Sequence, residues 1–174
     1  MILMQLKIAL ITEDTYSPDF IRRLIKREDF PINNHKINVC KGEHTRGGIV
    51  KPCWDKIRRV LSKDLFEKCD RVIIFVDADG YDRNEIKERV IDHIKNSKWL
   101  GPQVEKYISD KKLSIIVFSE EIEEWIVPGT PKPSEYLKKI KNYDKRQLPE
   151  MANEVNFSKL KSVESFNEFI EAIQ

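Results

Sequence analysis

Carboxylates follow two hydrophobic segments of the chain: Glu13 ends the segment LKIALITE, and Asp77 and Asp79 end the segment RVIIFVDAD. Because side chains alternate along a strand, the carboxylates of Asp77 and Asp79 are predicted to point to the same side. Neighbouring carboxylates repel each other unless a cation or a proton lies between them, and Mg²⁺ prefers oxygen ligands. The pattern therefore predicts that Glu13, Asp77 and Asp79 bind Mg²⁺ or Mn²⁺. The alternative is that both aspartates only begin a turn before Gly80, which Asp and Gly favour.

A third hydrophobic segment, LSIIVFS, is followed directly by the glutamates Glu120, Glu121, Glu123 and Glu124. Residues two apart on a helix do not face one another, so we expect only one of Glu121 and Glu123 to enter a metal site. The alternative is a solvated helix start, where acidic side chains interact favourably with the positive end of the helix dipole. That alternative applies mainly to Glu120 and Glu124.

A basic, glycine-containing segment is the candidate nucleic-acid contact. Lys41, His44, Arg46 and Lys51 surround two consecutive glycines at 47–48. A backbone phosphate could be bound there by these side chains and by exposed amides at the start of the following helix. The alternative is an ordinary solvated loop. Zinc is not expected at His44, because no Cys or His lies at the usual short spacing.

Strand-like and helix-like segments alternate along the first three quarters of the chain. The expected strands are 6–12, 35–40, 71–79 and 113–119, and the expected helices are 20–30, 49–65, 86–94 and 120–129. The loop GEHTRGG (42–48) separates the second strand from its helix. Alternation of this kind predicts an α/β, Rossmann-like fold, with a mostly parallel sheet flanked by helices. Ligands of such sheets bind outside the carboxyl ends of the strands, where the acidic residues lie.

The remainder of the chain is rich in proline and charge and ends in an amphipathic segment, FSKLKSVESFNEFIEAI. We therefore expect an α/β domain over residues 1–128 and a helical extension over 129–174 packed on it. Trp54, Trp99 and Trp125 are expected to anchor the core, because tryptophan buries a large area.

The composition restricts the class of protein. The 174 residues are 40% hydrophobic and 34% charged, which predicts a folded, soluble chain, and the net charge of +2 excludes a uniform positive field for nucleic acid. No segment approaches the roughly 20 apolar residues that span a bilayer. Cys40, Cys53 and Cys69 form no CxxC pair, which favours a reducing, cytoplasmic compartment. Abundant Lys, Glu and Ile indicate a thermophilic origin.

The chain resembles Toprim domains in a combination of three features. These are Glu13, the DADG segment at 77–80 and the EIEEW segment at 121–125. Members of this family occur in topoisomerases, primases and nucleases of the overcoming-lysogenization-defect class, and the chain is most similar to small stand-alone Toprim-like proteins. The resemblance covers residues 6–128. The chain departs from the family pattern at Asp14, where a glycine is usual, and at Ser17, where an acidic residue is usual.

The resemblance implies a Mg²⁺-dependent enzyme acting on nucleic-acid phosphodiesters, namely a nuclease with a Toprim-like fold. It implies that Asp77 and Asp79 hold metal, while Glu13 binds metal or transfers a proton. Glu121 is the fourth candidate catalytic residue, and Glu123 is the fourth candidate metal ligand. DNA and RNA both remain open as substrates, as does the need for a partner ATPase.

Two alternatives come from other functional classes. A receiver-like signalling module would explain acids after two strands, but SIIVFSEE lacks the lysine that such a module needs after a late strand. A non-catalytic subunit or scaffold of a defence or repair complex would retain the fold with a vestigial metal site. Phosphate-loop, GxGxxG and GxSxG motifs are absent from the sequence.

Overall fold

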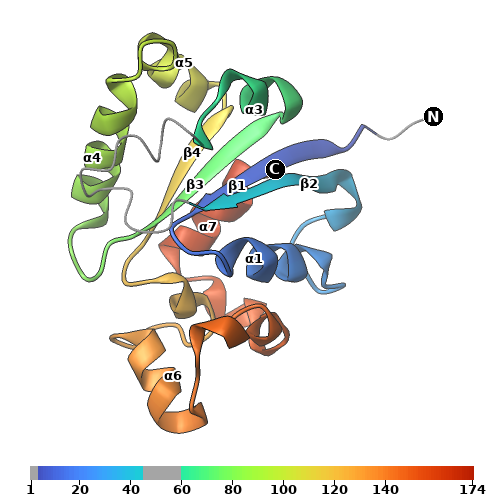
Figure 1. The fold of residues 1–174 in the computed structure, drawn as a ribbon. Coiled ribbons are helices and arrows are strands. Elements are labelled where there is room, and N and C mark those ends of the chain that lie inside the picture. Colours follow the sequence, from blue (N-terminus) through green and yellow to red (C-terminus); the bar gives the residue numbers. More distant parts are fainter. Residues whose placement is uncertain (1–3, 45–59) are drawn as a thin grey trace.

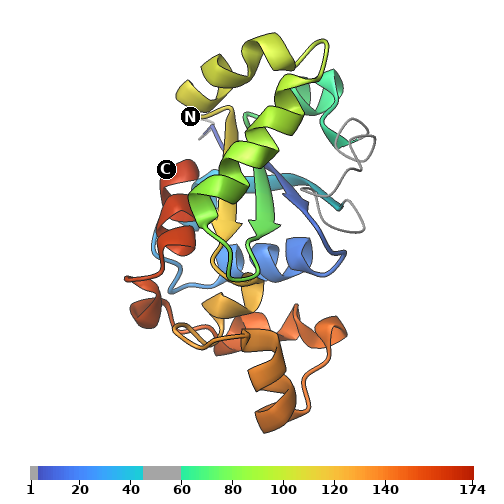
Figure 2. The same cartoon turned by 90° about the vertical axis from the view of Figure 1, so that its left-hand side faces the viewer.

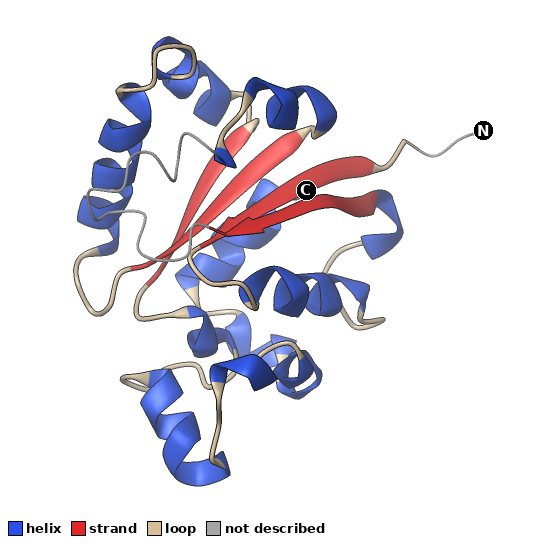
Figure 3. Ribbon diagram, viewed as in Figure 1, coloured by secondary structure: helices blue, strands red, loops and turns tan. Residues whose placement is uncertain are grey.

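The computed structural model describes residues 4–44 and 60–174. Its strands are β1 (Leu6–Thr12), β2 (Ile37–His44), β3 (Arg71–Asp77) and β4 (Leu113–Phe118). They form one sheet in the order β2-β1-β3-β4, and every neighbouring pair is parallel (Figures 1 and 3). The predicted α/β class with a parallel sheet flanked by helices is confirmed.

Helices cover both faces of the sheet. The α-helices are α1 (Ser17–Lys26), α3 (Lys63–Lys68), α4 (Arg83–Lys95), α5 (Val104–Ser109), α6 (Pro133–Lys141) and α7 (Glu164–Ala172). Buried side chains of α1 and α7 pack on one face, and those of α3, α4 and α5 pack on the other. Because side chains alternate along each strand, every strand contributes residues to the hydrophobic core on each face of the sheet. In β3, Ile73 and Phe75 face one core, and Val72 and Ile74 face the other. Burial on both faces explains why the strands are continuous apolar runs.

Short 3₁₀ helices connect the remaining segments. They are η1 (Asn34–Lys36), η2 (Gly101–Gln103), η3 (Ile122–Trp125), η4 (Lys145–Gln147), η5 (Glu150–Glu154) and η6 (Phe157–Leu160). Figure 2 shows the chain from η3 through η5 lying beyond the arrowheads of β3 and β4. This segment therefore lies at the carboxyl edge of the sheet.

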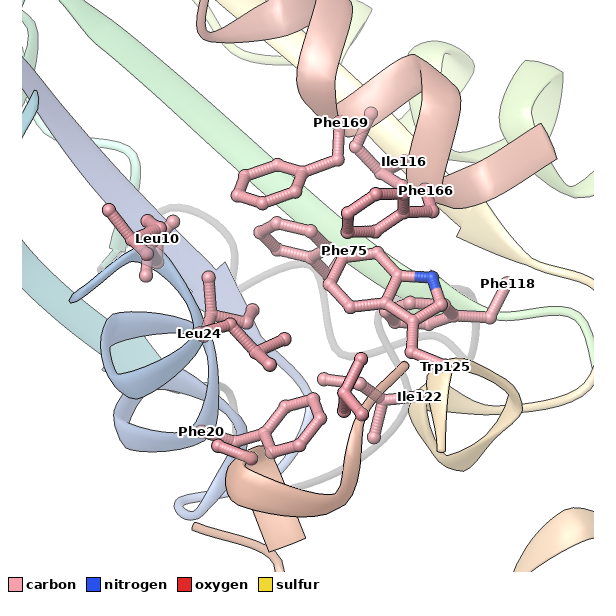
Figure 4. Close-up of a cluster of buried hydrophobic side chains, with 14 of the residues drawn as sticks. Leu10, Phe20, Leu24, Phe75, Ile116, Phe118, Ile122, Trp125, Phe166 and Phe169 are labelled. Carbon is pink, nitrogen blue, oxygen red and sulfur yellow. The ribbon is translucent and has the colours of Figure 1, made fainter. Parts of the chain in front are cut away.

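Trp125 is the centre of the larger core, as predicted. Its side chain is fully buried, and its ring lies 5.2 Å from Phe118, 5.2 Å from Phe166 and 5.4 Å from Phe169, measured between ring centroids (Figure 4). The indole N–H donates a hydrogen bond to Ser165 Oγ at 2.9 Å. Because Phe166 and Phe169 belong to α7, the two predicted parts of the chain share one core. Their division at residue 128 stays a prediction.

Local structure differs from the prediction at the second strand and the helix after it. The first three residues of the predicted loop, 42–44, belong to β2 and pair with β1 as far as Thr12↔His44. Of the predicted helix 49–65, residues 49–59 lie outside the described residues, and Trp54 is one of them. Val60 is helical, as predicted, but Leu61 is not, so that part of the prediction is wrong. A separate helix, α3, begins at Lys63, because Ser62 Oγ accepts the N–H of Leu65 and caps it.

A disulfide joins Cys40 of β2 to Cys69, which follows α3. No sequence pattern predicts this bond. Disulfides are typical of oxidising compartments, and intracellular proteins of hyperthermophiles are an exception. The cytoplasmic location therefore stays a prediction. Within residues 4–44 and 60–174, no helix has the length and apolar character needed to cross a membrane.

Candidate metal centre at the carboxyl edge of the sheet

Glu13 and Asp77 lie at the same edge of the sheet. Glu13 directly follows β1, Asp77 is the last residue of β3, and these two strands are neighbours in the sheet. Burial raises the pKa of the Asp77 carboxyl well above its ordinary value, and the charge of Glu13 raises it further. Lys145 lowers this pKa, whereas Glu123 and Asp79 add smaller increases. The structure thus brings four acidic residues and one lysine within electrostatic range of one another.

Asp79 reaches this edge through a turn. The strand ends at Asp77, so the prediction that strand alternation positions both aspartates is wrong. Asp79 has a left-handed backbone with φ of 50° and is exposed to solvent, and Gly80 follows with φ of 82°. The N–H groups of Asp79 and Gly80 donate to the carbonyls of Glu120 and Ser119 at 3.1 and 3.0 Å. These bonds fix the turn against the segment that follows β4.

Glu123 is the most deeply buried acid of the centre. Its side chain is 0% exposed, and Oε1 accepts hydrogen bonds from Tyr143 Oη at 2.9 Å and from Lys145 Nζ at 2.8 Å. Its Oε2 is buried and has no hydrogen-bond partner among the described residues. A buried carboxylate oxygen without a partner is costly, so this atom is a candidate ligand for a cation.

Lys145 is the basic residue of the centre, and no sequence pattern predicts it. Besides its bond to Glu123, its Nζ lies 3.8 Å from Asp14 Oδ2. Burial lowers the pKa of Lys145, but the charges of Glu123 and Asp14 outweigh burial and leave the pKa raised. Burial and the charge of Glu123 also raise the pKa of Tyr143, so its hydroxyl stays protonated and donates. Both residues come from the C-terminal part of the chain.

Two of the other glutamates after β4, Glu121 and Glu124, have structural partners. Glu121 Oε1 accepts the N–H of Ser134 at 2.7 Å, near the start of α6. The carboxylate of Glu124 accepts the N–H groups of Ser119 and Glu120 at 3.2 and 3.0 Å, and the hydroxyl of Ser165 at 2.6 Å. Of Glu121 and Glu123, only Glu123 is among the charges that raise the pKa of Asp77.

Asp14 and Ser17, the two departures from the Toprim pattern, form the start of α1. Asp14 Oδ1 accepts the N–H groups of Tyr16 and Ser17, both at 2.8 Å, and the hydroxyl of Ser17 donates to Asp14 Oδ2. These bonds satisfy backbone donors that have no partner within the helix. Asp14 consequently fixes the loop that carries Glu13.

The predicted nucleic-acid contacts are only partly described. Arg46 and Lys51 lie outside the described residues, as do the two glycines between them. Lys41 and His44 belong to the carboxyl half of β2. Since His44 pairs with Thr12, the β2 strand ends at the same edge as β1. Nucleic-acid binding by the four residues stays a prediction.

The donor set fits a weakly pre-formed Mg²⁺ site. Among the described residues, no three acidic, His or Cys side chains are grouped closely enough to hold a metal ion as they stand. Mg²⁺ commonly keeps several waters and binds through one or two carboxylates, so a complete cage is not needed. The partnerless Oε2 of Glu123 and the carboxylate of Asp77 would supply such ligands. A zinc site would need more protein ligands.

Fold and site together define an α/β protein with an acidic centre at the carboxyl edge of a parallel sheet. Comparisons of the chain with known protein families, curated proteins and solved structures gave no match. The residues of the centre are therefore the basis for assigning a function.

Replacing Lys145 by alanine is expected to destabilise the metal-free protein, because buried Glu123 loses its cationic partner. Lys145 is 35% exposed, so solvent screening limits the loss in unfolding free energy to about 2 kcal/mol. Urea unfolding in EDTA measures this loss. Lys141→Ala is the matched control, since its partner Glu154 is half-exposed and the pair should contribute under about 0.5 kcal/mol. Equal losses in both variants would contradict the role given to Lys145.

Proposed function

We propose that the protein is a Mg²⁺-dependent enzyme that hydrolyses nucleic-acid phosphodiester bonds, a nuclease of the Toprim type. The observation that carries the proposal is the buried oxygen of Glu123 that has no hydrogen-bond partner among the described residues. It lies in a centre where burial and neighbouring carboxylates raise the pKa of Asp77. Such a centre favours binding of a divalent cation. It also favours a substrate whose phosphate oxygens act as further ligands of that cation. The resemblance of Glu13, the DADG segment and the EIEEW segment to Toprim domains supports the same chemistry.

Each residue of the centre has a role in this proposal. Asp77 and Glu123 hold the metal, with Asp79 supplying a further carboxylate from the turn. Bound Mg²⁺ would polarise a phosphoryl oxygen and favour deprotonation of a coordinated water. Glu13 either completes the metal ligands or accepts the proton of the attacking water. Glu121 is left out of the set, because its carboxylate caps α6.

Lys145 and Asp14 support the centre from outside the ligand set. The ammonium of Lys145 lies between Glu123 and Asp14 and partly neutralises the acidic residues. Tyr143 holds Glu123 Oε1, so Oε2 is the oxygen left for the metal. The C-terminal part of the chain thereby positions a metal ligand that belongs to the segment after β4.

Calorimetric titration with Mg²⁺ tests the metal centre. The wild type should bind Mg²⁺, and Asp77→Asn should weaken the affinity by at least about tenfold, because even supporting groups around a metal contribute that much. Affinity should rise with pH, since the raised pKa of Asp77 means that metal must displace a proton. Asp92→Asn, on the exposed face of α4, is the control and should bind as the wild type does. Unchanged binding in Asp77→Asn would exclude the proposed ligand set.

The position of Lys145 favours a second candidate, a receiver-like module. Receivers use an acceptor aspartate after a later strand, acids after the first strand and a lysine after a late strand. The order of the described strands, β2-β1-β3-β4, matches the first four strands of such a doubly wound sheet. Lys145 supplies the lysine that the segment after β4 lacks. Incubation with a small phosphodonor and intact-mass measurement distinguishes the two functions, since only a receiver gains a phosphoryl group on Asp77. A scaffold would neither gain this group nor cleave nucleic acid.

A further inference from the structure

Tyr81, in the loop between β3 and α4, exposes a large aromatic ring to solvent. The residue is 74% exposed, compared with 42% for Tyr136, the other exposed aromatic side chain among the described residues. The Tyr81 ring has no stacking partner and no side-chain hydrogen bond within the described part of the chain. Single exposed apolar residues are common on protein surfaces, so the exposure alone carries no function. Two features distinguish Tyr81 from other exposed apolar residues: its backbone is held by hydrogen bonds, and it lies close to the acidic centre.

The backbone around Tyr81 is held on both sides. Its N–H donates to the carbonyl of Ala78 at 2.9 Å, and the preceding Gly80 is bonded to Ser119. The following residue, Asp82, caps α4 by accepting the N–H of Glu85 at 2.9 Å. A ring on a fixed backbone loses little conformational entropy when it binds a flat ligand. The exposed ring is therefore a pre-organised surface.

The location of Tyr81 points to a nucleobase as this ligand. Tyr81 is two residues from Asp79 and four from Asp77, in the loop that closes the proposed metal centre. A phosphodiester held by the metal would place the adjacent nucleotide next to this loop. Bases of unpaired strands stack readily on aromatic side chains, whereas bases within a duplex are already stacked on one another.

A groove of about 920 Å³ continues from the same loop. Its lining includes Glu120, and a Cβ built on Gly80 would lie 3.4 Å from Glu120 Oε1, so the groove and the loop are adjacent. Lys159 and Lys161 also line the groove, and neither ammonium has an ion-pair partner among the described residues. Two carboxylates of the same lining are engaged, Glu124 by the hydroxyl of Ser165 and Glu164 by Arg83. Free ammonium groups in an open groove suit the phosphates of a continuing strand.

We propose that the substrate is an unpaired nucleic-acid strand, with one base stacked on Tyr81 next to the cleaved phosphodiester and the backbone continuing toward Lys159 and Lys161. The proposal rests on the proposed nuclease function and names its substrate class. Tyr81 is a binding residue that sets the preference for unpaired strands. The metal centre performs the hydrolysis.

Fluorescence anisotropy with a labelled single-stranded oligonucleotide and its duplex tests this proposal, with Ca²⁺ replacing Mg²⁺ to prevent cleavage. The wild type should bind the single strand more tightly than the duplex. Tyr81→Ala should weaken single-strand binding by about fivefold to a hundredfold, the range that corresponds to loss of one stacked base. Tyr81→Phe keeps the ring and should bind within about twofold of the wild type. Tyr136→Ala is the control for loss of an exposed tyrosine and should bind normally.

The outcomes separate this proposal from the nuclease function. Cleavage with normal single-strand binding by Tyr81→Ala would overturn the stacking role and leave the nuclease intact. Single-strand binding that depends on Tyr81, without any Mg²⁺-dependent cleavage, would support stacking and overturn the catalytic function. Tighter binding of the duplex than of the single strand would overturn the substrate class.

Discussion

Replacing Asp77 by asparagine is expected to lower Mg²⁺-dependent cleavage of nucleic acid by about a thousandfold or more. A metal ligand contributes through the charge stabilisation that Mg²⁺ gives the transition state, which amounts to several kcal/mol, and each 1.36 kcal/mol corresponds to about tenfold in rate. Asparagine has the shape of aspartate, so the loss reports chemistry and not packing. Initial rates of oligonucleotide cleavage at saturating Mg²⁺ measure the effect.

The stability of Asp77→Asn shows whether a loss of cleavage reflects lost chemistry or lost folding. Because burial and Glu13 raise the pKa of Asp77, the folded protein binds this proton more tightly than the unfolded chain does. Without metal, the wild type should therefore lose stability as pH rises above the ordinary aspartate range and through the raised pKa. Asp77→Asn lacks this loss and should be at least as stable at neutral pH. Retained cleavage in this folded variant, with Asp92→Asn as the active control, would exclude Asp77 from catalysis.

Replacing Trp125 by alanine is expected to lower the free energy of unfolding by about 3–5 kcal/mol. The indole is fully buried among Phe75, Phe118, Phe166 and Phe169, so its removal leaves a cavity between β3, β4 and α7. The hydroxyl of Ser165 also loses its indole donor. This loss is a large part of the free energy of unfolding of a typical domain, which is about 5–15 kcal/mol. Urea denaturation followed by circular dichroism measures it.

Two further variants make the result specific. Trp125→Phe keeps an aromatic ring and removes the N–H, and should cost less than half as much as alanine. Trp99→Ala should also cost less, because Trp99 is half-buried and stacks edge-on with Phe66 on the other side of the sheet. If Trp125→Ala were no more destabilising than Trp99→Ala, the central role of Trp125 in the shared core would be wrong.

The sequence predicted those features that depend on local patterns. The strand LKIALIT matches β1 residue for residue, because continuous apolar runs bounded by acids are characteristic of buried parallel strands. Once the strands are parallel, Glu13 and Asp77 must share an edge. Trp125 could be placed in the core because tryptophan buries a large area and its segment follows a buried strand, whereas Trp99, predicted by the same rule, is only half-buried.

Other features of the site depend on distant contacts that no local pattern reveals. Lys145 and Tyr143 lie in a segment without hydrophobic periodicity, and only the folded chain brings them to Glu123. The choice between Glu123 and Glu121 is likewise decided by distant partners, because Ser134 engages Glu121. The left-handed backbone of Asp79 belongs to a turn, which strand alternation cannot anticipate. Cysteine spacing alone does not reveal the pairing of Cys40 with Cys69.

The late position of Tyr143, Lys145 and α7 in the chain has a consequence for synthesis on the ribosome. Chains grow from the N-terminus, and their early parts begin to fold while later residues are still inside the exit tunnel. Here the strands can pair early, but Glu123 Oε1 lacks both of its hydrogen-bond donors until Tyr143 and Lys145 have emerged. The face of Trp125 that packs on α7 stays uncovered until Phe169 has emerged. A nascent chain stalled before this point would expose aromatic side chains to chaperones and lack a finished acidic centre. The core and the acidic centre therefore both wait for the segment 143–169 to emerge.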